Sequence, residues 1–160
     1  MIRLTRQTDY GIVLLSRFAA APQAVVHNAR EVAAEAHLPL PMVSKILKKL
    51  AREGLLVSLR GVKGGYSLAR PAASITVAEA IDALEGPIAM TACTGSRSCR
   101  HEEHCGVRGN WQKINQALRE ALESLTLLDM SGTLDEKGLV SLTRRPAAVA
   151  AIETATLEIR

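Results

Sequence analysis

Residues 41–53 read PMVSKILKKLARE, and this stretch decides the fold. Its apolar residues recur at positions i, i+3, i+4 and i+7, which predicts an amphipathic helix with Pro41 in the first turn. The side chains expected to face a core are Val43, Ile46, Leu47 and Leu50. Gly54 follows at the position where glycine commonly ends a helix. The helix therefore has an apolar side for packing and a basic side that stays exposed.

Two short strands are expected immediately after this helix. Residues 55–59 (LLVSL) are apolar and partly β-branched, and residues 66–69 (YSLA) alternate in polarity. Between them lies RGVKGG at 60–65, whose glycines can adopt the positive φ that a hairpin turn requires. The sequence therefore predicts a β-hairpin next to the basic helix.

Upstream of residue 41 the pattern is helical. Apolar periodicity predicts a helix over 6–20 and a second over 29–36, with Asn28 as the N-cap of the second. The stripe expected on the first helix consists of Tyr10, Val13, Leu14 and Phe18, and Val32 and Ala33 should face inward on the second. Three helices followed by a hairpin is the order of a winged helix-turn-helix. The predicted fold class is mainly α, with a small β wing and a long dimerisation helix further along the chain.

The basic helix and the hairpin are predicted to bind double-stranded DNA. A helix of this shape fits the major groove, where its N-terminal residues meet base edges and its remaining cations contact phosphates. Arginine on a glycine-rich wing is suited to a minor groove. The predicted contacts are Ser44 and Lys45 to bases, Lys48, Lys49 and Arg52 to phosphates, and Arg60 and Lys63 from the wing. The alternatives are an ordinary solvated helix face and a simple tight turn.

The distribution of charge supports a polyanionic ligand for the first half of the chain. Residues 1–70 carry eleven Lys and Arg against four Asp and Glu, a net charge of +7, whereas residues 71–160 carry nine against twelve. Such a basic half points to nucleic acid. Aromatic residues make up only 2% of the chain. Few rings are thus available to stack on unpaired bases, which argues against single-stranded nucleic acid as the main ligand.

The second half of the chain should contain two more helices around a loop. Thr76 and Glu79 form a capping box for a helix over 77–84, and a polar loop spans about 91–105. A helix over 107–128 then has apolar residues in steps of three and four, which is typical of pairing with another long helix. We expect three regions: a DNA-binding domain at 1–75, the loop and dimerisation helix at 76–130, and a weakly ordered tail at 131–160.

Three cysteines, Cys93, Cys99 and Cys105, are the only ones in the chain, with five residues between each neighbouring pair. An odd number leaves no complete disulfide pairing within one chain. Structural zinc sites commonly use closer cysteine pairs, so wide and equal gaps favour an iron–sulfur cluster over zinc. Three unrelated free thiols are the remaining interpretation, although a polar loop is unsuited to burying all three.

Four blocks of sequence, in order, carry a resemblance to a known family. They are MIRLTRQTDYGIVLL (1–15), LVSLRGVKGGYSLARP (56–71), ITVAEAIDALEGPI (75–88) and the C-x5-C-x5-C spacing. Over residues 1 to about 130 the chain resembles the winged-helix regulators that include the iron–sulfur cluster regulator IscR, the nitric-oxide-responsive repressor NsrR and the rhizobial iron regulator RirA. It is most similar to the subgroup that regulates SUF iron–sulfur assembly, which also has W-x2-I-N and T-L-x-D-M motifs like those at 111–115 and 126–130.

The resemblance implies a homodimer joined through the long helix, with one cluster per subunit. The 4Fe–4S type is favoured and the 2Fe–2S type is possible. Cys93, Cys99 and Cys105 fall on the three cysteine ligands of the family. Asp9 falls on the aspartate that NsrR-like members supply from the partner's first helix, whereas Arg108 stands where IscR-like members carry a ligating histidine.

Other interpretations of these positions remain open. His101 and His104 are rival ligands within the loop, and Asp9 could be an ordinary carboxylate in the first turn of a helix. Ser44 stands where some relatives carry a glutamate that discriminates between operators.

The expected function is a DNA-binding transcription regulator, not an enzyme. It should act as a repressor that senses iron–sulfur cluster status, iron, oxygen or nitric oxide, and should control iron–sulfur assembly genes. The alternatives are an iron–sulfur electron-transfer protein and a zinc-stabilised winged-helix interaction module. The segment GIVLLSRFAAA at 11–21 is too short and too interrupted by charge to be a signal peptide, and no stretch has a membrane-spanning length. We expect a cytoplasmic protein, in which thiols stay reduced.

Overall fold

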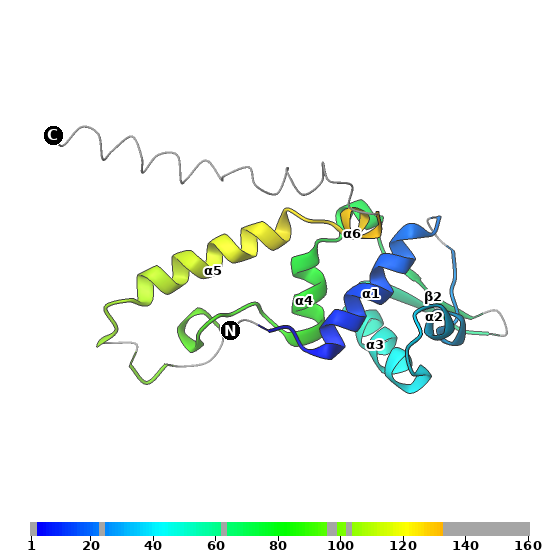
Figure 1. Ribbon diagram of the computed structural model, residues 1–160, viewed down its shortest axis with the longest axis horizontal. Helices are drawn as coiled ribbons and strands as arrows, with labels where there is room; N and C mark the ends of the chain where they lie inside the picture. The colour runs from blue at the N-terminus through cyan, green and yellow to red at the C-terminus, as the bar shows by residue number, and fades with distance from the viewer. Residues whose placement is uncertain (1–2, 23–24, 62–63, 96–98, 102–103, 133–160) are drawn as a thin grey trace.

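The structure is a computed structural model that describes residues 3–22, 25–61, 64–95, 99–101 and 104–132. Three helices and a two-stranded sheet form the predicted DNA-binding part, and α4 leads from it to the long helix α5 (Figure 1). The elements are α1 (Arg6–Ala20), α2 (Ala29–Glu35), α3 (Leu40–Arg52), β1 (Leu56–Leu59), β2 (Gly65–Leu68), η1 (Ala72–Ser74), α4 (Val77–Glu85), η2 (Ala92–Thr94), α5 (Arg108–Glu123) and α6 (Leu127–Ser131). The predicted winged helix-turn-helix order is confirmed.

The helices begin and end at the residues whose side chains or backbone freedom allow it. Thr5 caps α1 and Asn28 caps α2, each by accepting a hydrogen bond from a backbone N–H in the first turn. Thr76 and Glu79 form the predicted capping box at the start of α4. Gly54 and Gly86, with φ of 78° and 96°, lie just after α3 and α4 in a conformation that other residues rarely adopt.

One hydrophobic core holds the predicted DNA-binding part together. The four apolar side chains predicted to face inward from α3 have no exposed surface, and Val32 and Ala33 of α2 are buried as expected. Ala80 and Leu84, which lie beyond the predicted boundary at residue 75, belong to the same core. The α1 stripe differs in one position, because Val13 is 39% exposed and Leu15 is buried in its place.

The predicted single helix over 107–128 is divided in the structure. Helix α5 ends at Glu123 and α6 begins at Leu127. The cause is tertiary: the backbone N–H of Leu127 donates to the carbonyl of Ile75 at 2.9 Å, and the Leu127 side chain is completely buried. Thr126 then starts α6 with its own capping box. The chain therefore returns from α5 to pack α6 against α1.

The wing is an antiparallel hairpin with Leu56 opposite Leu68 and Leu59 opposite Gly65. Gly61 has a φ of 116°, which is the positive value that the predicted turn required. His27 extends the sheet by one bridge to Tyr66, through two backbone hydrogen bonds of 2.9 Å. Lys63 and nearly all of the predicted tail lie outside the described residues. Within the part that is described, no helix combines the length and the apolar character that crossing a membrane would require.

Helices α1 and α4 cross so closely at Gly11 that a Cβ there would collide with the buried Leu84 side chain. Gly11→Ala should therefore lower the free energy of unfolding by about 1 kcal/mol, because overpacking outweighs the better helix propensity of alanine. The measurement is urea unfolding followed by circular dichroism. Gly109→Ala in α5, where nothing lies within 4 Å, is the matched control and should not lower stability. Equal effects of the two substitutions would contradict the close crossing.

Candidate functional site

The polar side of α3 presents cations to solvent. Lys45, Lys48 and Arg52 are exposed, and Ser44 is half-buried at the N-terminal end of the same side. Arg52 pairs with its neighbour Glu53, at 3.1 Å and in an exposed position, which restrains it weakly. The burial of the opposite side fixes the direction in which these cations point. The predicted DNA-reading residues of α3 are thus available to a ligand.

A groove of about 510 Å³ lies between α1 and α3. It is lined by Gln7 of α1 and by Lys45, Lys48, Lys49 and Arg52 of α3. Four cations around one hollow make it strongly attractive to a phosphate group. Gln7 is not among the predicted residues, because an uncharged residue more than thirty positions upstream carries no charge signal and joins the groove only through helix packing.

Lys49 differs from the other cations of α3. Its Nζ donates a 2.7 Å hydrogen bond to the carbonyl of Leu84, near the end of α4. The adjacent Glu85 accepts a 2.6 Å hydrogen bond from the backbone N–H of Thr5. Burial raises the pKa of Glu85, but hydrogen bonds from Thr5 and Thr8 and the charge of Lys49 outweigh it and hold this pKa below its usual range. Lys49 thus ties α3 to α4 and α1.

Arg60 lies at the start of the turn between the two strands of the wing. Arg60 is exposed and follows directly after β1. Val57 and Leu59 of β1 are also exposed, at 44% and 43%. The wing therefore offers one cation and an apolar surface to solvent.

The three cysteines lie between α4 and α5. Cys93 is in η2, Cys105 lies just before α5, and all three thiols are free and half-buried. The Cys93 sulfur lies 3.2 Å from the Thr91 hydroxyl oxygen. Among the described residues, no three His, Cys, Asp or Glu side chains gather as a metal-binding group. The donor set nevertheless suits soft iron, because it consists of three reduced thiols on one polar loop.

The rival and additional ligands are all on the surface. Asp9 is exposed on α1, and within the described residues its carboxylate has no side-chain hydrogen bond or ion pair. His101 and His104 are exposed in the loop, and Arg108 is the first residue of α5. The structure places none of these side chains in a metal-binding group with two cysteines.

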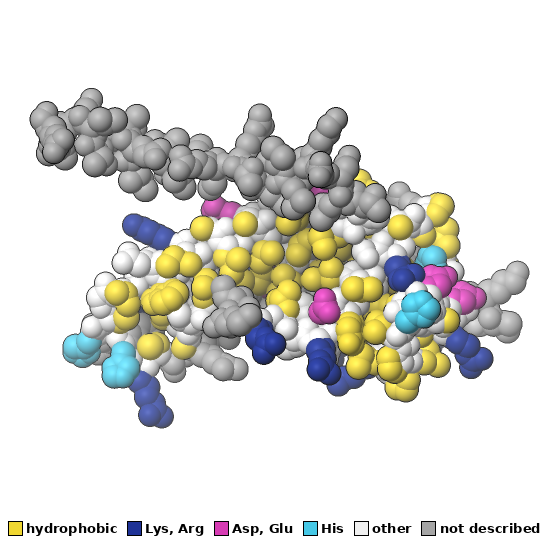
Figure 2. Space-filling model, in the orientation of Figure 1, with side chains coloured by type: hydrophobic (Ala, Val, Ile, Leu, Met, Phe, Trp, Pro, Cys, Tyr) yellow, Lys and Arg dark blue, Asp and Glu magenta, His cyan; other side chains and the backbone are white. Residues whose placement is uncertain are grey.

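Helix α5 has an apolar face that the rest of the chain covers only in part. None of its residues is fully buried, and Ile114 is 46% exposed. Trp111 and Leu118 line a groove of about 490 Å³ with Ile81, Pro87 and Met90. Figure 2 shows hydrophobic side chains gathered over α4 and α5 on this side of the molecule. This face extends beyond what α4 covers.

Comparison with known proteins identifies the family. Residues 4–133 match the Rrf2 family, described as an iron-dependent transcriptional regulator. The chain is 31% identical, over 90% of its length and 88% of the relative's, to the HTH-type transcriptional regulator ORF2 of Azotobacter vinelandii. It is 27% identical, over 82% of its length and 86% of the relative's, to the HTH-type transcriptional regulator IscR of Escherichia coli.

A solved structure supports the same assignment. CymR, the global cysteine regulator of B. subtilis, matches with a TM-score of 0.69 and 27% sequence identity, covering 84% of this chain and all of that one (100%). Members of this family regulate transcription and are not enzymes, which agrees with the exposed basic helix and the wing. The chain therefore belongs to the Rrf2 family of winged-helix transcriptional regulators.

Proposed function

We propose that this regulator binds promoter DNA as a homodimer, and that an iron–sulfur cluster on the cysteine loop sets its affinity for DNA. The observation that carries the proposal is the set of three free thiols on one loop, in a chain whose family is described as iron-dependent. The 4Fe–4S type is favoured and the 2Fe–2S type is possible. The target genes are those for iron–sulfur assembly, which the protein represses.

The DNA contacts follow from the exposed side of α3. Ser44 and Lys45, near the N-terminal end of α3, reach base edges in the major groove. Lys48 and Arg52 contact phosphates, which orient the protein without reading sequence. Lys49 contributes its charge to the same groove while its Nζ holds Leu84. Arg60 and Lys63, the two cations predicted for the wing, enter the neighbouring minor groove.

The partly covered face of α5 supports the homodimer. Exposed apolar residues at helical spacing on a helix of 16 residues favour packing against a second copy of the same helix. Pairing of two copies through Ile114 and Leu118 would remove this apolar surface from water. The two recognition helices would then meet half-sites about one turn of DNA apart, which is the usual spacing for such dimers.

The cluster is held by Cys93, Cys99 and Cys105 together with Asp9 of the partner subunit. Asp9 is exposed and without a side-chain partner among the described residues, so it is available to a second subunit. When bound, the cluster supplies iron that reacts with oxygen or nitric oxide. A carboxylate is a harder ligand than a thiolate, so the aspartate side of this site is the labile one.

The path from the loop to the DNA-binding helix runs through α4. The loop begins a few residues after Glu85, and Glu85 and Leu84 contact α1 and Lys49. A change in the arrangement of the loop therefore acts on the two helices that line the DNA groove. Cluster state biases the dimer between two arrangements with different affinity for DNA.

Anaerobically purified protein should be brown, with broad visible absorbance and both iron and acid-labile sulfide. Cys99→Ser should bleach it, because a thiolate ligand is lost. In gel shifts, the holo form and the chelator-stripped form should differ in affinity for promoter DNA by about 5–150-fold, the usual range of coupling between two sites. A colourless protein that contains zinc would contradict the cluster and favour the zinc-stabilised interaction module.

Lys48→Ala should weaken binding by a similar factor on every duplex, because it removes a phosphate contact. The slope of log K against log salt concentration should flatten by about one per protomer. The measurement is fluorescence anisotropy on specific and random duplexes at several salt concentrations. Lys113→Ala, which removes an exposed lysine from α5, is the control and should leave the slope unchanged. An unchanged slope in Lys48→Ala as well would argue against the DNA-binding side of α3.

Asp9→Ala should change the visible spectrum of the cluster and speed its loss, whereas Arg6→Ala, in the same exposed turn, should not. A mixed dimer tests whether Asp9 acts across the interface. One protomer carries Asp9→Ala, and the other carries serine at all three cysteines. If Asp9 ligates in the partner's site, this heterodimer regains one complete site with wild-type absorbance. Failure to regain it would place the fourth ligand within the same subunit.

A further inference from the structure

We infer that Asn115 of α5 is the positioning residue for the first cysteine of the loop, and that it links the loop to the proposed dimerisation helix. The Asn115 carboxamide oxygen accepts a 3.0 Å hydrogen bond from the backbone N–H of Met90. Its amide nitrogen donates a 3.2 Å hydrogen bond to the carbonyl of Ile88. One side chain thus bonds to two backbone groups, the N–H of Met90 and the carbonyl of Ile88, in the segment that leads to Cys93. We call this pair of hydrogen bonds the Asn115 clamp.

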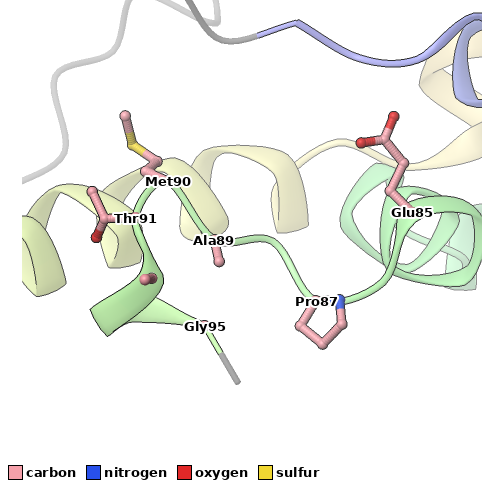
Figure 3. Close-up of a pocket in the computed structure, with 7 residues that line it drawn as sticks. Glu85, Pro87, Ala89, Met90, Thr91 and Gly95 are labelled. Atoms are coloured by element: carbon pink, nitrogen blue, oxygen red, sulfur yellow. The ribbon is translucent and has the colours of Figure 1, made fainter. Parts of the chain in front are cut away.

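A second contact holds the same segment from α4. Asp82 accepts a 2.9 Å hydrogen bond from the backbone N–H of Ile88 through Oδ1 and pairs with Arg119 at 2.9 Å through Oδ2. Arg119 lies one turn after Asn115 on the same side of α5, and its hydrogen bond and ion pair with Asp82 raise its pKa. The segment is therefore fixed to α4 and α5 together. Figure 3 shows it running from Glu85 past Pro87 and Ala89 to Met90 and Thr91, alongside α5.

The clamp affects the position of Cys93 because Met90 lies only three residues before it. Thr91 follows Met90, and its side chain and backbone form a reciprocal capping arrangement with Thr94 that shapes η2. The Thr94 hydroxyl donates to the carbonyl of Thr91 at 3.0 Å. The Thr91 hydroxyl lies 3.2 Å from the sulfur of Cys93, closer than it lies to the Thr94 hydroxyl at 3.4 Å. The position of Met90 therefore decides where the Cys93 sulfur lies.

Both ends of the cysteine loop are consequently attached to the same helix. The far end is attached covalently, because Cys105 lies three residues before the start of α5. The near end is attached by Asn115, seven residues into the helix and about 10 Å along its axis from the first residue. The clamp thus sets the separation of the first and last cysteines. A cluster held between them would bear directly on α5.

Local sequence preference does not account for an asparagine at this position. Asparagine is a poor residue for the interior of a helix, because its side chain competes for backbone hydrogen bonds. Leucine or alanine at 115 would stabilise α5 as a helix and extend its apolar face. The hydrogen bonds to Met90 and Ile88 explain why asparagine stands at position 115, because without them two partly buried backbone groups would lose their partners.

The test begins with apo protein, in which no cluster contributes. Asn115→Leu should speed hydrogen exchange at the Met90 amide by about three- to tenfold, the cost of one lost hydrogen bond. It should also speed alkylation of Cys93 relative to Cys105. Asn115→Asp keeps the acceptor for Met90 and loses the donor to Ile88, so its exchange rate at Met90 should stay closer to wild type. Gln116→Leu removes an exposed amide that bonds only to Glu120 and is the control.

The second measurement uses anaerobically reconstituted protein. Asn115→Leu should lose its visible absorbance to a chelator about 10- to 100-fold faster than wild type, the usual effect of removing a residue that orients a metal ligand. The Asn115→Asp protein should lose its absorbance at an intermediate rate, and the Gln116→Leu protein should lose it at the wild-type rate. Because Trp111 is the only tryptophan and lines the groove with Met90, its fluorescence in each variant reports whether the segment has moved.

The inference rests on the proposed function, but the two fail differently. Unchanged exchange at Met90 and unchanged Cys93 alkylation in Asn115→Leu would overturn the clamp. Faster exchange together with wild-type cluster lifetime would show a merely structural role and also overturn it. A wild-type protein that takes up no cluster would contradict the proposed function, while faster alkylation of Cys93 in Asn115→Leu would still support the clamp.

Discussion

The structure depends first on the complete burial of one side of α3. Val43, Ile46, Leu47 and Leu50 have no exposed surface, and burial of each such side chain contributes about 1.5–3 kcal/mol. This packing against α1, α2 and α4 leaves α3 no freedom to rotate. Because the orientation of the helix is fixed, its cations point away from the core, and Arg60 of the wing is also exposed. The cationic surface that we propose to read DNA follows from the requirements of the core.

Helix α4 connects this surface with the cysteine loop. One side of α4 packs against α1 at Gly11, so closely that a Cβ there would collide with the Leu84 side chain, and its end accepts a hydrogen bond from Lys49. Its other side holds α5 through the ion pair of Asp82 and Arg119. The same short helix therefore touches the DNA-binding helices and the helix that we propose to form the dimer. A two-state regulator needs such a shared element, since both sites must bias it.

The cysteine loop is held at both of its ends. Hydrogen bonds that Asn115 and Asp82 accept from the backbone N–H groups of Met90 and Ile88 fix the segment before Cys93, and α5 begins just after Cys105. Between these anchors the three thiols are free. In the proposed regulation, a bound cluster completes an arrangement whose ends the protein has already positioned. This division of roles is usual for metal sites, in which surrounding hydrogen bonds orient the ligands.

The sequence by itself determined the helices, the wing and the candidate residues, because local periodicity, capping boxes and glycine positions are properties of short segments. It also indicated the family, through four ordered blocks. Only the tertiary structure decided that Val13 is exposed, that Gln7 joins the cations of α3, that Lys49 holds Leu84 and that the long helix breaks before Leu127. Each of these depends on contacts between residues far apart in sequence, where the burial of a core overrides local preference.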